Sequence, residues 1–229
     1  MEAFYERTQS VLGNDGLQSI KAAKVAVIGL GGVGSYIAEA LARCGVGELV
    51  LIDGDRVMQS NINRQLYALN STVDRFKSDV AKQRVADINP AAKVTAWADF
   101  VNDGNVGSFG LENCDYIADA IDSVADKIAI IAFAKSKNIP VISCMGTGNK
   151  LNPQQLSVAD ISKTTVCPLA RAVRHALKQK GITKGVKTVF STEQPIKNNN
   201  GHIGSISFVP SSAGLLMASV IIKELADIE

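Results

Sequence analysis

The chain has 229 residues, 46% of them hydrophobic, and a formal net charge of +2, so it can form a full α/β core and has no general attraction to nucleic acids or membranes. Its four cysteines form no CxxC pair, so we expect no zinc site of the paired-cysteine type. The N-terminus lacks a signal-peptide pattern and the apolar run 213–222 is too short to span a bilayer, so we expect a cytoplasmic protein without a membrane anchor.

A glycine-rich turn joins the first predicted strand to a predicted helix. Residues 25–28 are apolar and mostly β-branched, which indicates a buried strand, and residues 34–44 have a helical pattern. Between them, Gly29, Gly31 and Gly34 fit the dinucleotide-binding fingerprint. Backbone N–H groups at the start of such a helix face outward and can hold a phosphate group.

The next predicted strand, residues 48–52, is followed directly by Asp53. A carboxylate in this place, after a glycine-rich turn, can accept hydrogen bonds from the hydroxyl groups of a ribose. These two features alone would indicate a nicotinamide-dependent oxidoreductase. The residues that follow favour a nucleoside triphosphate with a metal ion, because they add cations and a carboxylate that hydride transfer does not need.

Two of these residues are cations. Arg64 lies in an uncharged, asparagine-rich turn, and Lys77 opens a predicted helix at 77–88 that Asn89-Pro90 ends. The arginine side chain offers a planar fork and the lysine a compact charge, and both suit a phosphate group. We therefore expect both side chains to bind phosphate.

Strand and helix patterns then alternate, with strands at 94–98, 116–121 and 141–143 and a helix at 126–137. This order predicts a Rossmann-like, mostly parallel sheet with helices on both faces, which binds its ligands at the carboxyl ends of the strands. Gly29, Asp53 and Asp122 each follow a predicted strand, so we expect them to converge on one edge of the sheet.

Asp122 ends a buried strand, where its carboxylate can hold Mg²⁺ directly or through water near a phosphate group. Asp119 lies three residues earlier, and strand alternation places the two side chains on opposite faces. We therefore expect Asp122 to be a metal ligand and Asp119 to have a structural role.

After residue 146 the character of the sequence changes. The elements predicted here are strands at 155–158 and 205–209, a basic helix at 167–180, a hairpin turn at 198–201 and a helix from 213 to about 225. We expect a single domain, in which residues 1–148 form the nucleotide-binding core and residues 149–229 a substrate-side extension.

A basic insertion lies between residues 160 and 201, where eight lysine and arginine residues face two acidic residues and give a net charge of +6. Arg171, Arg174 and Lys178 follow i, i+3, i+7 spacing and would lie along one helical face that can track an RNA backbone. The alternative interpretation is an ordinary solvated helix face.

In its glycine turn, Asp53, Asn61-Ile62-Asn63-Arg64-Gln65, Lys77 and Asp122, the chain resembles the bacterial MoeB/ThiF/HesA group of the ubiquitin-activating superfamily. The resemblance implies an adenylating enzyme, in which a carboxylate attacks the α-phosphate of ATP. It also implies a homodimer, in which Arg7 reaches across to the ATP of the partner. The nucleotide site implied by the resemblance consists of Gly29, Gly31, Gly32, Gly34, Asp53, Asn61, Arg64, Gln65, Lys77, Asp122 and Ser123.

The part of the chain after residue 146 resembles one subgroup, the tRNA threonylcarbamoyladenosine dehydratases, in segments such as 163–164, 168–170, 189–193 and 204–211. This resemblance implies that Mg²⁺-dependent adenylation of the threonyl carboxylate on tRNA is followed by ring closure through the carbamoyl nitrogen. It leaves open an association with sulfur-mobilising partner proteins. The basic residues assigned to tRNA are Lys163, Arg171, Arg174 and Lys178.

Other functions remain as alternatives. A sulfur-carrier adenylyltransferase would activate the C-terminus of a small ubiquitin-like protein, but the MoeB and ThiF enzymes carry paired CxxC motifs that this chain lacks. A nicotinamide-dependent oxidoreductase leaves Arg64, Lys77 and Asp122 without roles. A non-catalytic adaptor is disfavoured by the intact set of nucleotide-binding residues.

Overall fold

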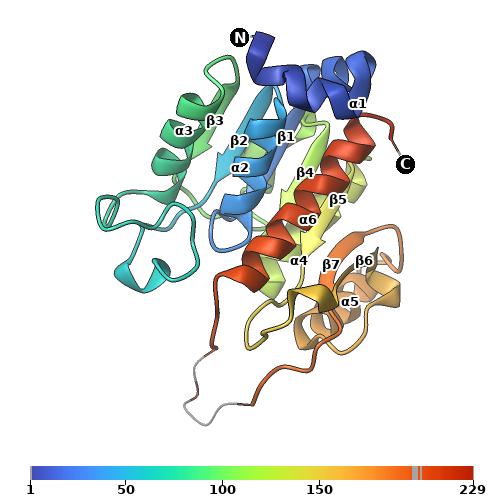
Figure 1. Ribbon diagram of the computed structural model, residues 1–229. Coiled ribbons are helices and arrows are strands. Elements are labelled where there is room, and N and C mark those ends of the chain that lie inside the picture. Colours follow the sequence, from blue (N-terminus) through green and yellow to red (C-terminus); the bar gives the residue numbers. More distant parts are fainter. Residues whose placement is uncertain (1, 198–200, 202, 229) are drawn as a thin grey trace.

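The computed structural model of the protein describes residues 2–197, 201 and 203–228 and has one seven-stranded sheet in the order β3-β2-β1-β4-β5-β7-β6 (Figure 1). Strand β6 pairs antiparallel with β7, and the other neighbouring strands are parallel. The strands are β1 (Lys24–Ile28), β2 (Glu48–Ile52), β3 (Lys93–Trp97), β4 (Tyr116–Asp119), β5 (Val141–Cys144), β6 (Leu156–Asp160) and β7 (Lys187–Ser191). This topology confirms the predicted Rossmann-like, mostly parallel sheet.

The helices cover both faces of the sheet, as predicted. They are α1 (Glu2–Ala22), α2 (Gly34–Cys44), α3 (Lys77–Ile88), α4 (Val124–Ser136), α5 (Pro168–Gln179) and α6 (Phe208–Leu225). Short 3-10 helices lie at Gln59–Asn61, Val106–Ser108, Leu111–Asn113, Pro153–Gln155 and Ile161–Lys163. Helices α2 and α6 pack together on the face turned to the viewer in Figure 1, and α4 packs with α5 on the other face.

Alternation along the strands divides the core into two layers. Val25 and Val27 of β1 belong to the core beneath α1, α2, α3 and α6, whereas Ala26 and Ile28 belong to the core beneath α4 and α5. Because both faces are covered, the central strands are continuous runs of buried residues rather than an alternation of apolar and polar ones.

The prediction of a strand at 205–209 is wrong, because helix α6 already begins at Phe208. Alternating serine and apolar residues in Gly204-Ser205-Ile206-Ser207 resemble a strand, but Pro210 lies in the first helical turn, where a proline is tolerated. Helix α1 and strand β7 were not among the predicted elements. The predicted turn at 198–201 includes residues 198–200, which lie outside the described part of the chain.

The 18 residues of helix α6 have the length and composition of a membrane-crossing helix. It is the one helix of this kind among the described residues. Its buried side chains, including Val209, Met217 and Ile221, pack into the same core as α2. Packing of this kind is that of a core helix in a globular domain.

Candidate nucleotide site

The glycine turn between β1 and α2 leaves no room for side chains at two positions. Gly29 has a φ of 84°, and a Cβ there would lie 2.9 Å from the carbonyl carbon of Ala120. A Cβ on Gly34 would overlap the carbonyl oxygen of Gly29. The turn therefore requires glycine, and it brings the start of α2 close to the loop that follows β4.

Asp53 lies beside this turn at the carboxyl end of β2. Its Oδ2 accepts a hydrogen bond of 2.6 Å from the Leu30 backbone N–H, and its Oδ1 accepts one of 2.8 Å from the Asp55 N–H. Burial raises the pKa of the Asp53 carboxyl group above its ordinary value, while the charge of Lys77 and the two backbone donors act against this shift. The carboxylate is thus fixed against the glycine turn.

The loop after β2 brings three of the predicted residues to the same place. The buried Asn61 accepts a hydrogen bond of 3.1 Å from the Met58 N–H, which closes a short turn. A Cβ on Gly31 would lie 3.6 Å from Gln65 Nε2, and one on Gly32 would lie 3.5 Å from Arg64 Cγ. Arg64 and Gln65 therefore lie directly against the glycine turn.

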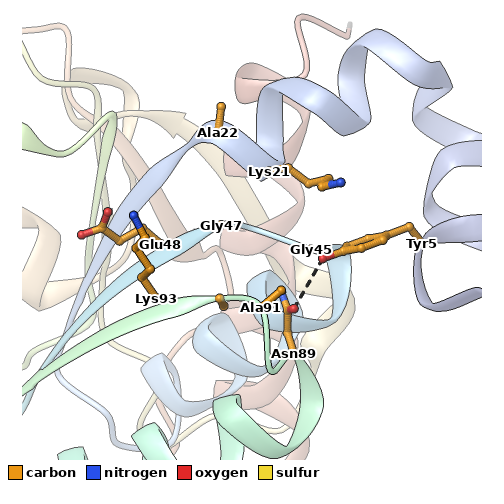
Figure 2. A pocket seen from close by; sticks show the side chains of 10 residues that line it. Tyr5, Lys21, Ala22, Gly45, Gly47, Glu48, Asn89, Ala91 and Lys93 are labelled. Carbon is orange, nitrogen blue, oxygen red and sulfur yellow. Dashed lines mark hydrogen bonds between the residues drawn. The ribbon is translucent and has the colours of Figure 1, made fainter. Parts of the chain in front are cut away.

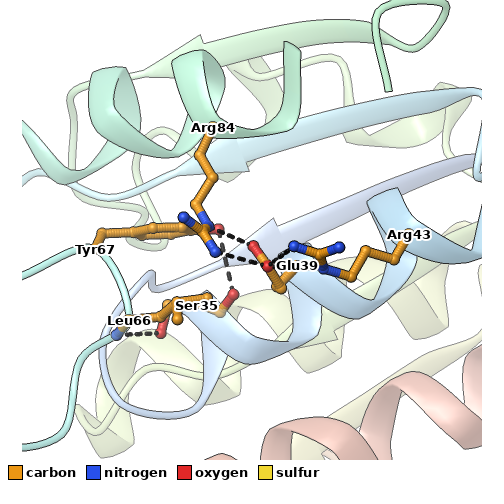
Figure 3. A network of polar contacts seen from close by, with 6 residues as sticks. All are labelled: Ser35, Glu39, Arg43, Leu66, Tyr67 and Arg84. Carbon is orange, nitrogen blue, oxygen red and sulfur yellow. Dashed lines mark hydrogen bonds and ion pairs between the residues drawn. The ribbon is translucent and has the colours of Figure 1, made fainter. Parts of the chain in front are cut away.

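A polar network ties this loop to α2 and α3 (Figure 3). Ser35 at the start of α2 accepts a hydrogen bond from the Leu66 N–H at its Oγ and one from the Tyr67 hydroxyl at its carbonyl oxygen. One turn further along α2, Glu39 accepts two hydrogen bonds from Arg84 of α3, at 2.6 and 2.8 Å. These contacts fix the positions of the glycine turn, the Arg64 loop and α3 relative to one another.

Lys77 is the first residue of α3 and is almost fully buried. Its Nζ lies 2.7 Å from Asp55 Oδ2, and the Asp55 carboxylate is half-exposed. Because Asp55 follows Asp53 by two residues, this ion pair keeps the lysine ammonium group beside the carboxyl end of β2.

Asp122 lies in the loop between β4 and α4, with an exposed side chain. Within residues 2–197, 201 and 203–228, no hydrogen bond or ion pair engages its carboxylate. Ser123 caps α4, because its Oγ accepts a hydrogen bond from the Asp126 N–H. The described residues contain no cluster of three or more potential metal-binding side chains, so a metal ion at Asp122 would take its other ligands from water or a bound nucleotide.

Asp119 has the structural environment that we expected. Its carboxylate is fully buried and lies 2.9 Å from Lys127 Nζ, and it accepts a 2.6 Å hydrogen bond from Ser143 Oγ. Lys127 and Ser143 were not among the predicted site residues. The available signal was that Lys127 directly precedes the apolar run 128–134 of α4.

Arg7 is the predicted residue that lies away from this edge. Helix α1 leads directly into the amino end of β1, at the top of Figure 1, whereas the glycine turn follows the carboxyl end. Tyr5, on the same helical turn as Arg7, lines a cavity of about 350 Å³ at the amino ends of β1, β2 and β3 (Figure 2). Arg7 therefore lies away from the candidate nucleotide site of its own chain.

The basic helix α5 has fewer free cations than its sequence suggests. Arg171 and Lys178 are exposed, as is Lys163 before the helix. Arg174 is half-buried, and its Nη1 donates hydrogen bonds to the Thr164 carbonyl oxygen at 2.9 Å and to Thr164 Oγ1 at 2.6 Å. The structure thus separates Arg174, which anchors the preceding turn, from the exposed pair.

The chain matches the ThiF family over residues 5–229. It is 42% identical over 243 aligned residues to the tRNA threonylcarbamoyladenosine dehydratase of Bacillus subtilis (strain 168), a match that covers 98% of this chain and 96% of that protein. It is also similar to crystal structures of the Escherichia coli tRNA N6-threonylcarbamoyladenosine dehydratase, each 37% identical to it and covering 98% of this chain and 94% of that one. The TM-scores are 0.93 for the complex with AMP and 0.92 for the complex with ATP.

Proposed function

The chain belongs to the ThiF family, and on this basis we propose that it catalyses an ATP-dependent ring closure on threonylcarbamoyladenosine in tRNA. The observation that carries the proposal is the similarity to dehydratases of this kind over nearly the full length of both proteins. It includes the residues after 148, to which we assign substrate binding, while residues 1–148 bind the nucleotide. A sulfur-carrier adenylyltransferase is less well supported, because the chain lacks the paired CxxC motifs of those enzymes.

The proposed ATP site follows from the contacts at the carboxyl edge. Asp53 would accept hydrogen bonds from the ribose hydroxyl groups, and backbone N–H groups at the start of α2 would face the phosphates. Arg64 would bind the phosphates beside the glycine turn, and Lys77 would join them by exchanging its contact with Asp55 for one with a phosphate oxygen. Asn61 and Gln65 would hold the Arg64 loop in place.

We assign Mg²⁺ to Asp122. Its exposed carboxylate offers the hard oxygen ligand that this ion prefers, and one carboxylate with nucleotide phosphates is a common magnesium site. Bound together with ATP, Mg²⁺ supplies positive charge that offsets the charge of the phosphates. Ser123, at the start of α4, keeps the Asp122 loop next to the helix.

The chemistry needs no nucleophile from the protein. The threonyl carboxylate attacks the α-phosphorus of ATP, the bond to pyrophosphate breaks, and the carbamoyl nitrogen of the same substrate then attacks the activated carbonyl carbon. AMP leaves, the nitrogen loses its proton, and the net change in the nucleoside is the loss of one water. An intramolecular attack in the correct geometry can contribute about 7–11 kcal/mol of the barrier reduction, so the main work of the protein is orientation and charge neutralisation.

We propose that the tRNA lies on the face of α5 that carries Arg171 and Lys178, with Lys163 beside it. A Cβ on Gly146, which follows β5, would lie 3.7 Å from Leu169 Cβ, so the amino end of α5 is near the carboxyl edge of the sheet. Arg174 has a different task, since its Nη1 is hydrogen-bonded within the protein. The two proposed substrates, tRNA and ATP, are both available in the cytoplasm, which agrees with the expected location.

A homodimer would explain Arg7. In its own chain this arginine lies on α1 at the amino ends of the strands, so it can complete a nucleotide site only in a second protomer. We therefore propose a composite site in which the partner supplies the arginine.

Sulfur-mobilising proteins take no part in the reaction proposed here.

Ligand-dependent unfolding tests the nucleotide assignment. Mg-ATP at a hundredfold excess over its Kd should stabilise the fold by about 2.7 kcal/mol. NAD at the same concentration should have a much smaller effect, because it uses neither Arg64 nor Lys77. Equal or greater stabilisation by NAD would overturn the assignment.

Charge reversal tests the RNA face. Arg171→Glu with Lys178→Glu should weaken tRNA binding strongly and flatten its dependence on salt, with Mg-ATP affinity unchanged. The matched control is Lys82→Glu with Lys93→Glu, which changes the net charge equally at exposed positions on α3 and β3. If both double variants bind tRNA alike, the α5 face is only a solvated surface.

A further inference from the structure

We propose that Asp119, Lys127 and Ser143 form a positioning unit that fixes the loop carrying Asp122 against the glycine turn. The inference rests on the proposed use of ATP and gives that site a component outside its nucleotide contacts. All three side chains are fully buried, so they act through the backbone of residues 120–122 and not by contact with the nucleotide. The unit joins three elements, because Asp119 ends β4, Lys127 lies on α4 and Ser143 lies on β5.

The three side chains form a closed set of contacts. Lys127 Nζ donates to Asp119 Oδ2 at 2.9 Å and to Ser143 Oγ at 3.2 Å, and Ser143 Oγ donates to Asp119 Oδ2 at 2.6 Å. The second carboxylate oxygen, Asp119 Oδ1, accepts a hydrogen bond of 3.2 Å from the Ile121 N–H. One carboxylate thus links a buried ion pair to the backbone immediately before Asp122.

The same loop is fixed from its other side by the nucleotide-binding turn. The Ala120 N–H donates to the Ile28 carbonyl oxygen at 2.8 Å, which extends the β1–β4 pairing by one step. Because a Cβ on Gly29 would lie 2.9 Å from the Ala120 carbonyl carbon, the two backbones are in direct contact there. A shift of Asp119 would therefore move Asp122 relative to the phosphate-binding turn.

A contribution to stability does not explain why the Lys127–Asp119 ion pair is buried. Both of its side chains are 0% exposed, whereas each of the other ion pairs between described residues has a side chain that is at least 30% exposed. A buried ion pair is often no more stabilising than apolar residues of equal volume, because both charges lose their hydration. Its value lies in its fixed geometry, and that geometry is transmitted to the Asp122 loop.

Hydrogen exchange of the backbone tests the positioning without reference to catalysis. Lys127→Met should speed exchange of the amides from Ile121 to Val124, with a smaller change in the rest of the sheet. The control, Ile221→Ala in the core of α6, should lower global stability without this local effect. Ser143→Ala keeps the ion pair and removes one hydrogen bond, so it tests the same loop even if Lys127→Met does not fold.

Kinetics then tests whether the unit acts through Asp122. Lys127→Met should lower kcat for AMP formation by on the order of 10–10²-fold, because a displacement of about 1 Å can have that effect, and Lys127→Arg should restore part of the loss. In the Asp122→Asn background, Lys127→Met should add little, since its route to the nucleotide is already removed. If the double variant lost kcat by the full product of the two separate losses, the positioning role would be overturned. Unchanged loop exchange in both Lys127→Met and Ser143→Ala would overturn it as well. A parent protein that forms no AMP would instead overturn the proposed function.

Discussion

Lys77 and Asp55 form an ion pair in which the lysine side chain is 4% exposed and the carboxylate 50% exposed, with 2.7 Å between Nζ and Oδ2. The pair holds the ammonium group at the edge where the phosphates of ATP are proposed to bind. The buried lysine therefore has a counter-charge before the nucleotide arrives. A phosphate oxygen can replace Asp55 as the counter-charge of Lys77, because the half-exposed Asp55 side chain can rotate toward the solvent.

Asp55→Asn should therefore lower the free energy of unfolding by about 1–3 kcal/mol, since it leaves a buried charged donor with a weaker acceptor. Mg-ATP should recover most of this loss, so its stabilising effect should be larger in the variant than in the parent. Urea denaturation with and without Mg-ATP measures both quantities. Asp103→Asn, at an exposed loop position, is the control. Equal ATP stabilisation in the parent and Asp55→Asn would refute the exchange of partners.

Arg64→Ala and Asp122→Asn should each slow AMP formation by on the order of 10²–10³-fold, because each removes charge stabilisation at the reacting phosphate. Both side chains are at least partly exposed, so the melting temperature should change little. Release of pyrophosphate is the measurement, and Lys82→Ala on the exposed side of α3 is the control. Near-normal release by either variant would remove that residue from the site.

Arg7→Ala should also lose activity, although it lies at the opposite end of its own sheet. If the site is shared between protomers, mixing Arg7→Ala with Asp122→Asn protein should restore turnover, because a heterodimer contains one site with both residues intact. Subunit exchange in the mixture is verified with differently tagged chains. A mixture that exchanges subunits but recovers no activity would contradict the composite site.

Binding of adenosine should weaken on acidification. Burial raises the pKa of Asp53, so its carboxylate becomes protonated at a higher pH than an ordinary aspartate as the pH falls. Protonation weakens the proposed acceptor for the ribose hydroxyl groups. The charge of Lys77 lowers the pKa of Asp53, and the charge of Asp55 raises it. Adenosine is the probe because it has no phosphate group to titrate. Calorimetry should show an affinity that falls as the pH is lowered through the raised pKa of Asp53, and Asp53→Asn should bind weakly at every pH.

The free energy of unfolding depends on pH in the opposite direction to the affinity for adenosine. Because the folded-state pKa of Asp53 is raised, the native protein holds this proton more tightly than the unfolded chain. Its ionisation therefore lowers stability as the pH rises from the ordinary value of 3.8 through the raised folded value. The stabilisation belongs to the protonated form, whereas the proposed ribose binding needs the ionised form.

The sequence was informative where a short motif determines local geometry. Gly29, Asp53 and Asp122 could be placed at one edge because parallel strands deliver their following residues to the same side of a sheet. Strand β7, which lies between β5 and β6, was missed because three of its five residues are polar, although all of them except Lys187 are buried. The strand predicted at 205–209 failed because its alternation of serine and apolar residues is also compatible with a segment leading into a helix.

The contacts that hold the site together could not be predicted in the same way. The pairing of Lys127 with Asp119 joins a helix to a strand, and Ser143 enters from a third element. The spacing of Arg174 predicts that it belongs to a free basic face, whereas its side chain is hydrogen-bonded to Thr164. Such pairings depend on how elements pack, and one sequence gives the residue types but not their partners.

Mass spectrometry of tRNA nucleosides tests the central claim most directly. tRNA that carries threonylcarbamoyladenosine is incubated with the protein, ATP and Mg²⁺, and is then digested to nucleosides under mild conditions. We expect threonylcarbamoyladenosine to be converted to a product lighter by one water, with one AMP formed per nucleoside, and we expect Asp122→Asn protein to convert far less. An unchanged nucleoside, with AMP formed only when a ubiquitin-like carrier protein is added, would contradict the central claim.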